Sequence, residues 1–111
     1  MSNRNRKNER ALVSLTARYR SPTAFDFVSE EGHDLSNGGM FICSTNPAPA
    51  GTLLKLECDV DSGAATIRAV ARVVWLRLEE MGGEPPGMGV KFVKLEPGSR
   101  DVIKSVLDRL G

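Results

Sequence analysis

Hydrophobic and polar residues alternate along most of the chain, with the period of two that marks a half-buried β-strand. The first run extends from Ala11 to Arg20, and a second begins at Phe25. Later runs cover residues 40–44, 54–60, 66–79 and 88–92. Because successive side chains of a strand point to opposite faces, each run can turn one face into a shared core. The pattern therefore predicts six strands, separated by segments rich in glycine, proline, serine and asparagine.

The run at 66–79 changes its hydrophobic parity along its length. Apolar residues first occupy the odd positions and then also the even ones, in the order Ile67, Ala69, Ala71, Val73, Trp75 and then Val74, Leu76, Leu78. An extra residue in one strand, a β-bulge, re-aims the side chains that follow it. We therefore expect a bulge near Val73 or Val74. Trp75 could offer a stacking face to a ligand, but because it continues the first parity, we predict that its ring lies in the core.

The last part of the chain has helical periodicity. Pro97 suits the first turn of a helix, and the apolar residues behind it share one helical face: Val102, Ile103, Val106, Leu107 and Leu110. We predict an amphipathic helix over residues 97–110. Six strands followed by one helix indicate a mainly β fold, a small antiparallel barrel or sandwich with the helix packed against it.

Length and composition are those of a single globular domain. The chain has 111 residues, of which 41% are hydrophobic and 26% are charged. No apolar run approaches the roughly 20 residues that span a bilayer, and the N-terminus lacks the apolar stretch of a secretory signal. The two cysteines are too few for a disulfide framework. We expect a cytoplasmic protein that does not insert into membranes.

Charge separates the first ten residues from the rest. They carry four basic residues against one acidic residue, a net charge of +3, whereas the other 101 residues carry −2. Residues 1–10 also lack apolar periodicity, so we predict a flexible basic arm at 1–10 and a globular domain at 11–111. The aromatic residues fall mostly at inward strand positions, which leaves no stacking platform for an oligonucleotide. We expect no DNA or RNA partner, although the arm could hold a small doubly charged anion.

Catalytic and metal-binding chemistry is largely excluded. The single histidine, His33, lies in a predicted loop, and Cys43 and Cys58 lie in strand patterns where a thiol serves as a small hydrophobe. One histidine and two cysteines without a recognised spacing do not indicate a metal site. No glycine-rich phosphate loop is followed by a lysine. We therefore expect a non-enzymatic protein with no catalytic residue, no metal and no cofactor.

Two short polar motifs remain. Arg6 and Arg10 form an Arg-x-x-x-Arg pair in the arm. Asp34, Ser36 and Gly39 form an Asp-x-Ser-x-x-Gly segment between the second and third predicted strands. Each motif alone has an ordinary interpretation: arginines in a polar arm are usually solvated charge, and an Asp-x-Ser loop is usually a turn whose side chains cap local backbone amides.

In this order, and on this strand pattern, the motifs resemble those of the PilZ domain family. The segment Asp-Leu-Ser-Asn-Gly-Gly-Met-Phe at 34–41 is similar to the family's second motif, and the segments at 73–76 and 86–92 are similar to its later strands. The resemblance covers almost the whole chain and implies a six-stranded antiparallel β-barrel with one C-terminal α-helix. Many members bind the bacterial second messenger cyclic di-GMP, whereas others have lost the arginines and act only through protein contacts. This chain keeps both motifs, which favours the binding class.

The resemblance implies that the ligand-contacting positions are Arg6, Arg10, Asp34, Ser36 and Gly39. An arginine fork matches phosphate oxygens and the O6/N7 edge of guanine, and it can stack on a base. The carboxylate of Asp34 can accept from N1–H and N2–H₂ of guanine, Ser36 adds a small hydroxyl, and Gly39 allows close approach of backbone or ligand. The secondary ligand-binding candidates are Arg4, Lys7 and Gly38.

The sequence thus predicts a bacterial, cytoplasmic receptor that holds cyclic di-GMP between the arm and the loop at 34–39. We expect it to signal through an unidentified downstream protein, because the chain shows no output domain. The alternative, from a different class, is a PilZ-like adaptor that docks proteins without binding cyclic di-GMP. The sequence leaves open the partner, the oligomeric state, and whether one ligand or a stacked pair binds.

Overall fold

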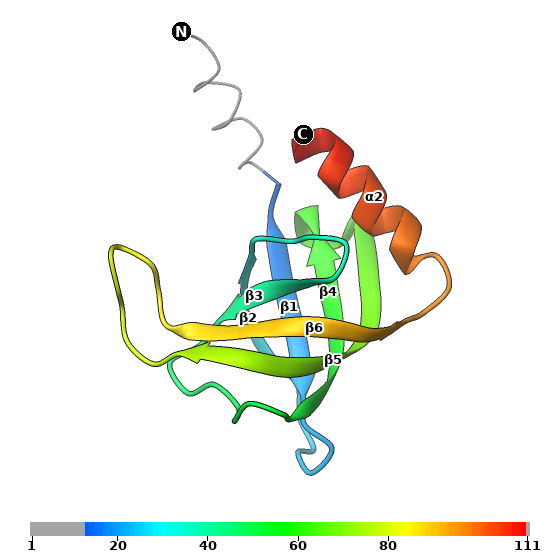
Figure 1. Cartoon of the computed structure of the whole chain (residues 1–111). Coiled ribbons are helices and arrows are strands. Elements are labelled where there is room, and N and C mark those ends of the chain that lie inside the picture. The colour runs from blue at the N-terminus through cyan, green and yellow to red at the C-terminus, as the bar shows by residue number, and fades with distance from the viewer. Residues whose placement is uncertain (1–12, 111) are drawn as a thin grey trace, which may run out of the picture.

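The structure, a computed structural model, describes residues 13–110, and they form a β-barrel with one helix (Figure 1). The predicted arm at 1–10 lies outside the described residues. The elements follow one another as β1 (Leu15–Arg20), β2 (Val28–His33), β3 (Gly39–Cys43), β4 (Leu53–Val60), a 3₁₀ turn η1 (Asp61–Gly63), β5 (Ala65–Arg77), β6 (Gly87–Leu95) and α2 (Ser99–Leu110).

The six strands close into a barrel in the order β1-β2-β3-β6-β5-β4. All neighbouring strands are antiparallel, and β1 closes the ring by pairing with β4. Closure removes the unpaired edges that an open sheet would expose. The predicted six-stranded antiparallel barrel with a C-terminal helix is therefore confirmed.

The core fills the barrel with inward side chains of β1, β3, β4, β5 and β6. Its largest fully buried members are Ile42, Leu54, Leu56, Ile67, Met88 and Val73, joined by Ile103 from α2. The helix lies against β5 across one end of the barrel (Figure 1). It begins at Ser99, after Gly98 at φ 88°, rather than at Pro97. The Ser99 hydroxyl accepts a hydrogen bond from the backbone N–H of Arg68 at 2.8 Å, which ties the start of α2 to β5.

A bulge in β5 reverses the expected placement of Trp75. Val73 lies opposite Val90 and Trp75 lies opposite Gly89, so Val74 is the extra residue. A second register shift occurs between Val70 and Ala71. The bulge near Val73 or Val74 is confirmed, but the core position of Trp75 is wrong. Val73 is 1% exposed and Trp75 is 45% exposed, because the bulge turns Trp75 to the outer face.

The second strand is shorter than the sequence pattern indicates. Phe25 is 97% exposed and Phe27 is 39% exposed in the loop before β2, which begins at Val28. A turn at Ser21–Ala24 precedes them, and the ring of Phe27 lies 5.5 Å from the Arg20 guanidinium. The expectation that the aromatic residues mostly point inward is therefore wrong for Phe25, Phe27 and Trp75. The predicted loop position of His33 is also wrong, because β2 extends to this residue.

Candidate functional site

The loop between β2 and β3 carries the Asp-x-Ser-x-x-Gly motif, and Ser36 fixes its shape. The Ser36 hydroxyl accepts hydrogen bonds from the backbone N–H groups of Gly38 and Gly39, both at 3.2 Å, and donates to the Gly39 carbonyl at 3.3 Å. The Ser36 N–H donates to that carbonyl at 2.9 Å. A hydroxyl has one donor hydrogen and two acceptor positions, so these bonds use its full capacity. The turn interpretation of the motif is thus correct for Ser36.

Asp34 and Leu35 point in opposite senses at the start of this loop. Leu35 is 7% exposed and belongs to the core, which anchors the loop to the barrel. Asp34 is exposed and has φ 54°, in the left-handed region that aspartate tolerates better than most residues. Because Leu35 is anchored in the core and the backbone of Asp34 is left-handed, the Asp34 carboxylate points to solvent at the start of the loop.

The two glycines of the motif have different surroundings. A Cβ on Gly39 would collide with the Val90 carbonyl oxygen of β6, so only glycine allows β3 and β6 to pair here. A Cβ on Gly38 would meet nothing within 4 Å. The Gly38 carbonyl accepts a hydrogen bond from the Phe92 N–H at 2.7 Å, which ties the loop to β6. Gly39 is therefore required by the barrel itself.

A surface hollow of about 420 Å³ joins this loop to the outer faces of β3, β5 and β6. Its motif residues are Asp34, Ser36, Gly38 and Gly39, and its other walls come from Met40, Phe41, Trp75, Gly89, Val90 and Lys91. The hollow therefore combines a carboxylate, an aromatic ring and a cation within the space of a nucleotide-sized group.

The Trp75 ring is held on the outer face by an aromatic and cationic stack. It stacks on Phe41 with centroids 5.3 Å apart and planes at 27°. The Arg77 guanidinium lies 4.6 Å from the Phe41 centroid and 5.2 Å from the Trp75 centroid, and it donates to the Pro85 carbonyl at 2.7 Å. Gly89 lies beneath the ring, where a Cβ would collide with the indole. These contacts fix one side of Trp75 and leave 45% of the residue exposed.

One basic side chain, Lys91, lines the hollow, and a second, Arg72, is its neighbour on β5. Lys91 lies opposite Gly39 on one side and opposite Arg72 on the other, and all three positions belong to the outer face. Arg72 donates to the Gly51 carbonyl at 3.3 Å. Within residues 13–110, Lys91 and Asp34 take part in no ion pair or side-chain hydrogen bond. Lys91 and Arg72 were not expected from the sequence, and Trp75 was expected in the core, because strand register, and not spacing along the chain, brings these residues to the motif.

The predicted arm residues Arg4, Arg6, Lys7 and Arg10 lie outside the described part of the chain. The structure does describe the segment that follows them, from Val13 to the start of β1. In the β1–β2 register Thr16 lies opposite Glu31, so the start of β1 lies beside the end of β2, where the motif loop begins. Val13 lines a second hollow, of about 660 Å³, together with Glu31 and His33. Figure 1 shows the start of β1 at the same end of the barrel as the β2–β3 loop.

The two cysteines differ in surroundings. Burial raises the pKa of the Cys58 thiol to about 12. Burial, followed by the charges of Glu31 and Glu30, also raises the pKa of the Cys43 thiol, although this residue is half-buried and lies near His33. A nucleophilic cysteine needs a lowered pKa, so the proximity of Cys43 and His33 does not form an activated catalytic pair.

Comparison with known proteins agrees with this architecture. The chain matches the PilZ domain family over residues 4–109, a span that includes both motifs. PilZ domains form a family of cyclic di-GMP-binding adaptors and are not an enzyme family. A search of curated proteins finds no matching sequence. Within residues 13–110, no helix has the length and apolar character needed to cross a membrane.

Proposed function

Because the chain belongs to the PilZ domain family, we propose that it is a receptor for cyclic di-GMP, which binds between the Arg6–Arg10 motif and the loop at 34–39. The observation that carries this proposal is the hollow at that loop, where exposed Asp34, Lys91 and Trp75 meet. Each suits one part of the ligand: a carboxylate for the guanine edge, a cation for a phosphate and an aromatic ring for a base.

Guanine recognition rests on Asp34 and Trp75. An ionised carboxylate has two oxygens, which can accept from N1–H and N2–H₂ of one guanine. The exposed side of the indole offers a surface for base stacking, which contributes about 1–3 kcal/mol per base in nucleic-acid-binding proteins. The outward position of Trp75, which the sequence pattern did not indicate, therefore strengthens the proposal.

Phosphate binding combines the barrel and the arm. Lys91 and Arg72 supply cations from the outer face, and Arg6 and Arg10 supply planar guanidinium groups that bind phosphate oxygens in pairs. Arg10 precedes Val13 by three residues, a distance of at most about 10 Å for an extended chain. Arg10 can therefore reach the end of the barrel that carries the loop, and Arg6 lies one further short stretch away. Arg4 and Lys7 are secondary phosphate contacts.

Ser36 and Gly39 act mainly as positioning residues in this proposal. The hydrogen bonds of Ser36 hold the loop in the form that presents Asp34, and Gly39 admits the backbone of β6. Gly38 is exposed and open, so ligand atoms can approach its backbone. We propose that the protein acts in a bacterial cytoplasm, where ligand binding changes the arm and the surface offered to a downstream partner.

Calorimetric titration of the full chain with cyclic di-GMP tests the proposal. We expect saturable binding, together with slower hydrogen exchange of the backbone amides of residues 1–10 and 34–39 when ligand is added. Binding without a change in the arm would contradict the arm's role. The absence of binding would favour the second class, an adaptor that docks proteins without cyclic di-GMP.

A further inference from the structure

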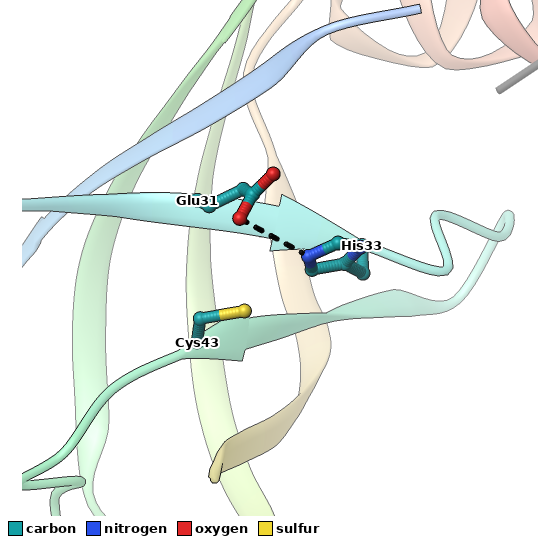
Figure 2. A group of neighbouring side chains, drawn as sticks. All are labelled: Glu31, His33 and Cys43. Atoms are coloured by element: carbon teal, nitrogen blue, oxygen red, sulfur yellow. Dashed lines mark ion pairs between the residues drawn. The ribbon is translucent and has the colours of Figure 1, made fainter. Parts of the chain in front are cut away.

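Three side chains with metal-binding atoms meet on the outer face of the β2–β3 hairpin. Glu31 and His33 come from β2 and Cys43 from β3, and their ligand atoms all lie within 4.8 Å of one another. Figure 2 shows the Cys43 Sγ turned toward the His33 ring, with a Glu31 carboxylate oxygen on the same side of that ring. This oxygen lies 3.5 Å from His33 Nε2.

Strand geometry explains this arrangement. Glu31 and His33 are two residues apart in one strand, so both side chains stand on the same face. Gly32 lies opposite Ile42 and His33 lies opposite Phe41, which brings Cys43 beside Glu31 across the hairpin. The inward neighbours Gly32 and Ile42 are buried, and the cluster is therefore on the outer surface.

The distances suit a tetrahedral zinc-type site. Zinc bonds of about 2.0–2.3 Å to nitrogen, oxygen and sulfur place neighbouring ligand atoms roughly 3.3–3.8 Å apart in a tetrahedron. The Glu31–His33 pair already meets this distance at 3.5 Å. A small side-chain rotation would bring the Cys43 sulfur into the same range. The side chains of His33 and Glu31 are 42% and 72% exposed, so a metal ion and a water ligand can reach them.

The surrounding charges favour a cation. The carboxylates of Glu31, Glu30 and Asp34 act on the Cys43 sulfur, against one positive group, Arg77. The guanidinium of Arg77 is directed elsewhere, since it lies over the Phe41 ring and bonds the Pro85 carbonyl. The cluster thus combines borderline and hard ligands in a negative environment, which suits Zn²⁺ better than Mg²⁺ or Ca²⁺.

We propose that Glu31, His33 and Cys43 bind a zinc-class divalent cation, with water as the fourth ligand. On binding, the Cys43 thiol loses its proton to solvent and coordinates as a thiolate, and His33 coordinates as a neutral imidazole. The metal ties β2 to β3 immediately before the loop at 34–38. The inference concerns the barrel alone and does not depend on cyclic di-GMP binding.

No metal site was expected from the sequence, because its histidine and cysteines have no recognised metal-binding spacing. His33 and Cys43 are ten residues apart in the sequence, on two paired strands, and the third ligand is a carboxylate. The second cysteine, Cys58, is fully buried and does not belong to this cluster.

Titration of the full chain with Co²⁺, followed by displacement with Zn²⁺, tests the proposal. We expect a thiolate-to-cobalt absorption band in the wild type that Zn²⁺ removes. Cys43→Ser should abolish the band, and His33→Asn and Glu31→Gln should each weaken binding by more than about tenfold. Cys58→Ala and Glu30→Gln are the matched controls and should retain the band. Binding without the band, or equal affinity in Cys43→Ser, would overturn the site.

Alkylation of the unmodified chain gives a second test that requires no variant. Zn²⁺ should slow the reaction of Cys43 with iodoacetamide by about tenfold or more, because the thiolate is coordinated. Cys58 is buried and should stay unreacted in the native protein with or without metal. Mass spectrometry of peptides separates the two positions. An unchanged Cys43 reaction rate at saturating Zn²⁺ would contradict the proposal.

Discussion

Charged side chains occupy two parts of the barrel's outer surface, and they differ in how they are paired. Over β1, β4 and β5, Arg18 lies 2.9 Å from Glu57 and 3.0 Å from Asp59, and Thr66 donates to Asp59 at 3.1 Å. Over β2, β3, β6 and β5, Asp34 and Lys91 are unpaired within residues 13–110 and stand beside exposed Trp75. We refer to these as the paired face and the open face.

This difference in pairing distinguishes charged groups that stabilise the fold from charged groups that are available to bind a ligand. On the paired face the groups satisfy one another across neighbouring strands, so a ligand would first have to break their bonds. On the open face the Asp34 carboxylate and the Lys91 ammonium have no ion-pair partner within residues 13–110, and the Trp75 ring, held on one side by Phe41 and Arg77, remains 45% exposed. Removal of a charged side chain from the paired face should therefore change stability, and removal of a charged or aromatic side chain from the open face should change ligand affinity.

The largest expected effect on ligand affinity comes from a substitution in the arm, which we propose completes the binding site of the open face. Arg10→Ala should weaken cyclic di-GMP binding by about 2–4 kcal/mol, because a guanidinium fork contacts phosphate or guanine. Arg10→Lys should restore little of this, since an ammonium lacks the planar fork. Arg100→Ala removes the same charge from exposed α2 and should bind normally. Calorimetry measures all three, and equal affinity for Arg10→Ala and wild type would exclude the role.

The glycine pair of the loop should give the largest effect on stability. Gly39→Ala should lower the free energy of unfolding by about 2–3 kcal/mol, because its Cβ would meet the Val90 carbonyl oxygen. Gly38→Ala should change it little, because that position is open. Denaturant titration of the two variants gives the comparison. If Gly38→Ala lowered the free energy of unfolding as much as Gly39→Ala, the close approach of β3 and β6 at Gly39 would not be the cause of the lost stability.

Stacking on Trp75 should have a smaller effect on binding. Trp75→Ala should weaken cyclic di-GMP binding by about 1–3 kcal/mol. Val74→Ala, at the exposed neighbouring bulge residue, should have no effect on affinity. Because Trp75 is the one tryptophan of the chain, ligand binding should also quench the intrinsic fluorescence of the wild type. Binding that leaves the fluorescence unchanged would place the base away from this ring.

The smallest expected effect is the loss of stability on breaking an ion pair of the paired face. The hydrogen bond from Arg18 holds the pKa of Asp59 below its ordinary value, with a further contribution from Thr66. A lowered folded-state pKa contributes stability that is complete above the unfolded value of about 3.9 and is lost as the pH falls through the folded value. Asp59→Asn should therefore cost about 1 kcal/mol of unfolding free energy at neutral pH and leave ligand affinity unchanged.

Chemical denaturation at a series of pH values checks this sign. The stability gap between wild type and Asp59→Asn should shrink as the pH falls below about 4, because the wild-type carboxyl becomes neutral as well. A gap that widens in acid would contradict the assignment.

Much of the fold followed from the sequence because alternation of polar and apolar residues directly reflects burial. The run at 54–60, for example, matches β4 with one residue added at its start. The bulge in β5 was also predictable, since the hydrophobic parity changes there. The outward position of Trp75 follows from that bulge, because an extra residue at either Val73 or Val74 re-aims the side chains after it; the core prediction was wrong because it continued the first parity past the bulge.

The site was predictable only in part for a related reason. The motif residues are close in sequence, so the pattern located the loop at 34–39. Trp75 and Lys91 join it through pairing with β6, and Cys43 meets His33 through pairing of β3 with β2. Such neighbours depend on register between strands. The sequence likewise shows that Gly39 is a glycine, but only the structure shows that the β6 backbone requires it.

Discrimination between two dinucleotides tests the central claim, that the open face reads guanine through Asp34. Competition titration of cyclic di-GMP and cyclic di-AMP should be made at two salt concentrations with wild type, Asp34→Asn and, as a control in the same loop, Asn37→Ala. Adenine lacks the paired N1–H and N2–H₂ donors, so wild type and Asn37→Ala should reject cyclic di-AMP by about 2–4 kcal/mol. Asp34→Asn keeps the tolerance for φ 54° and one acceptor oxygen, and it should narrow this gap. Equal binding of the two dinucleotides by wild type, falling steeply with salt, would instead show a phosphate clamp without guanine recognition.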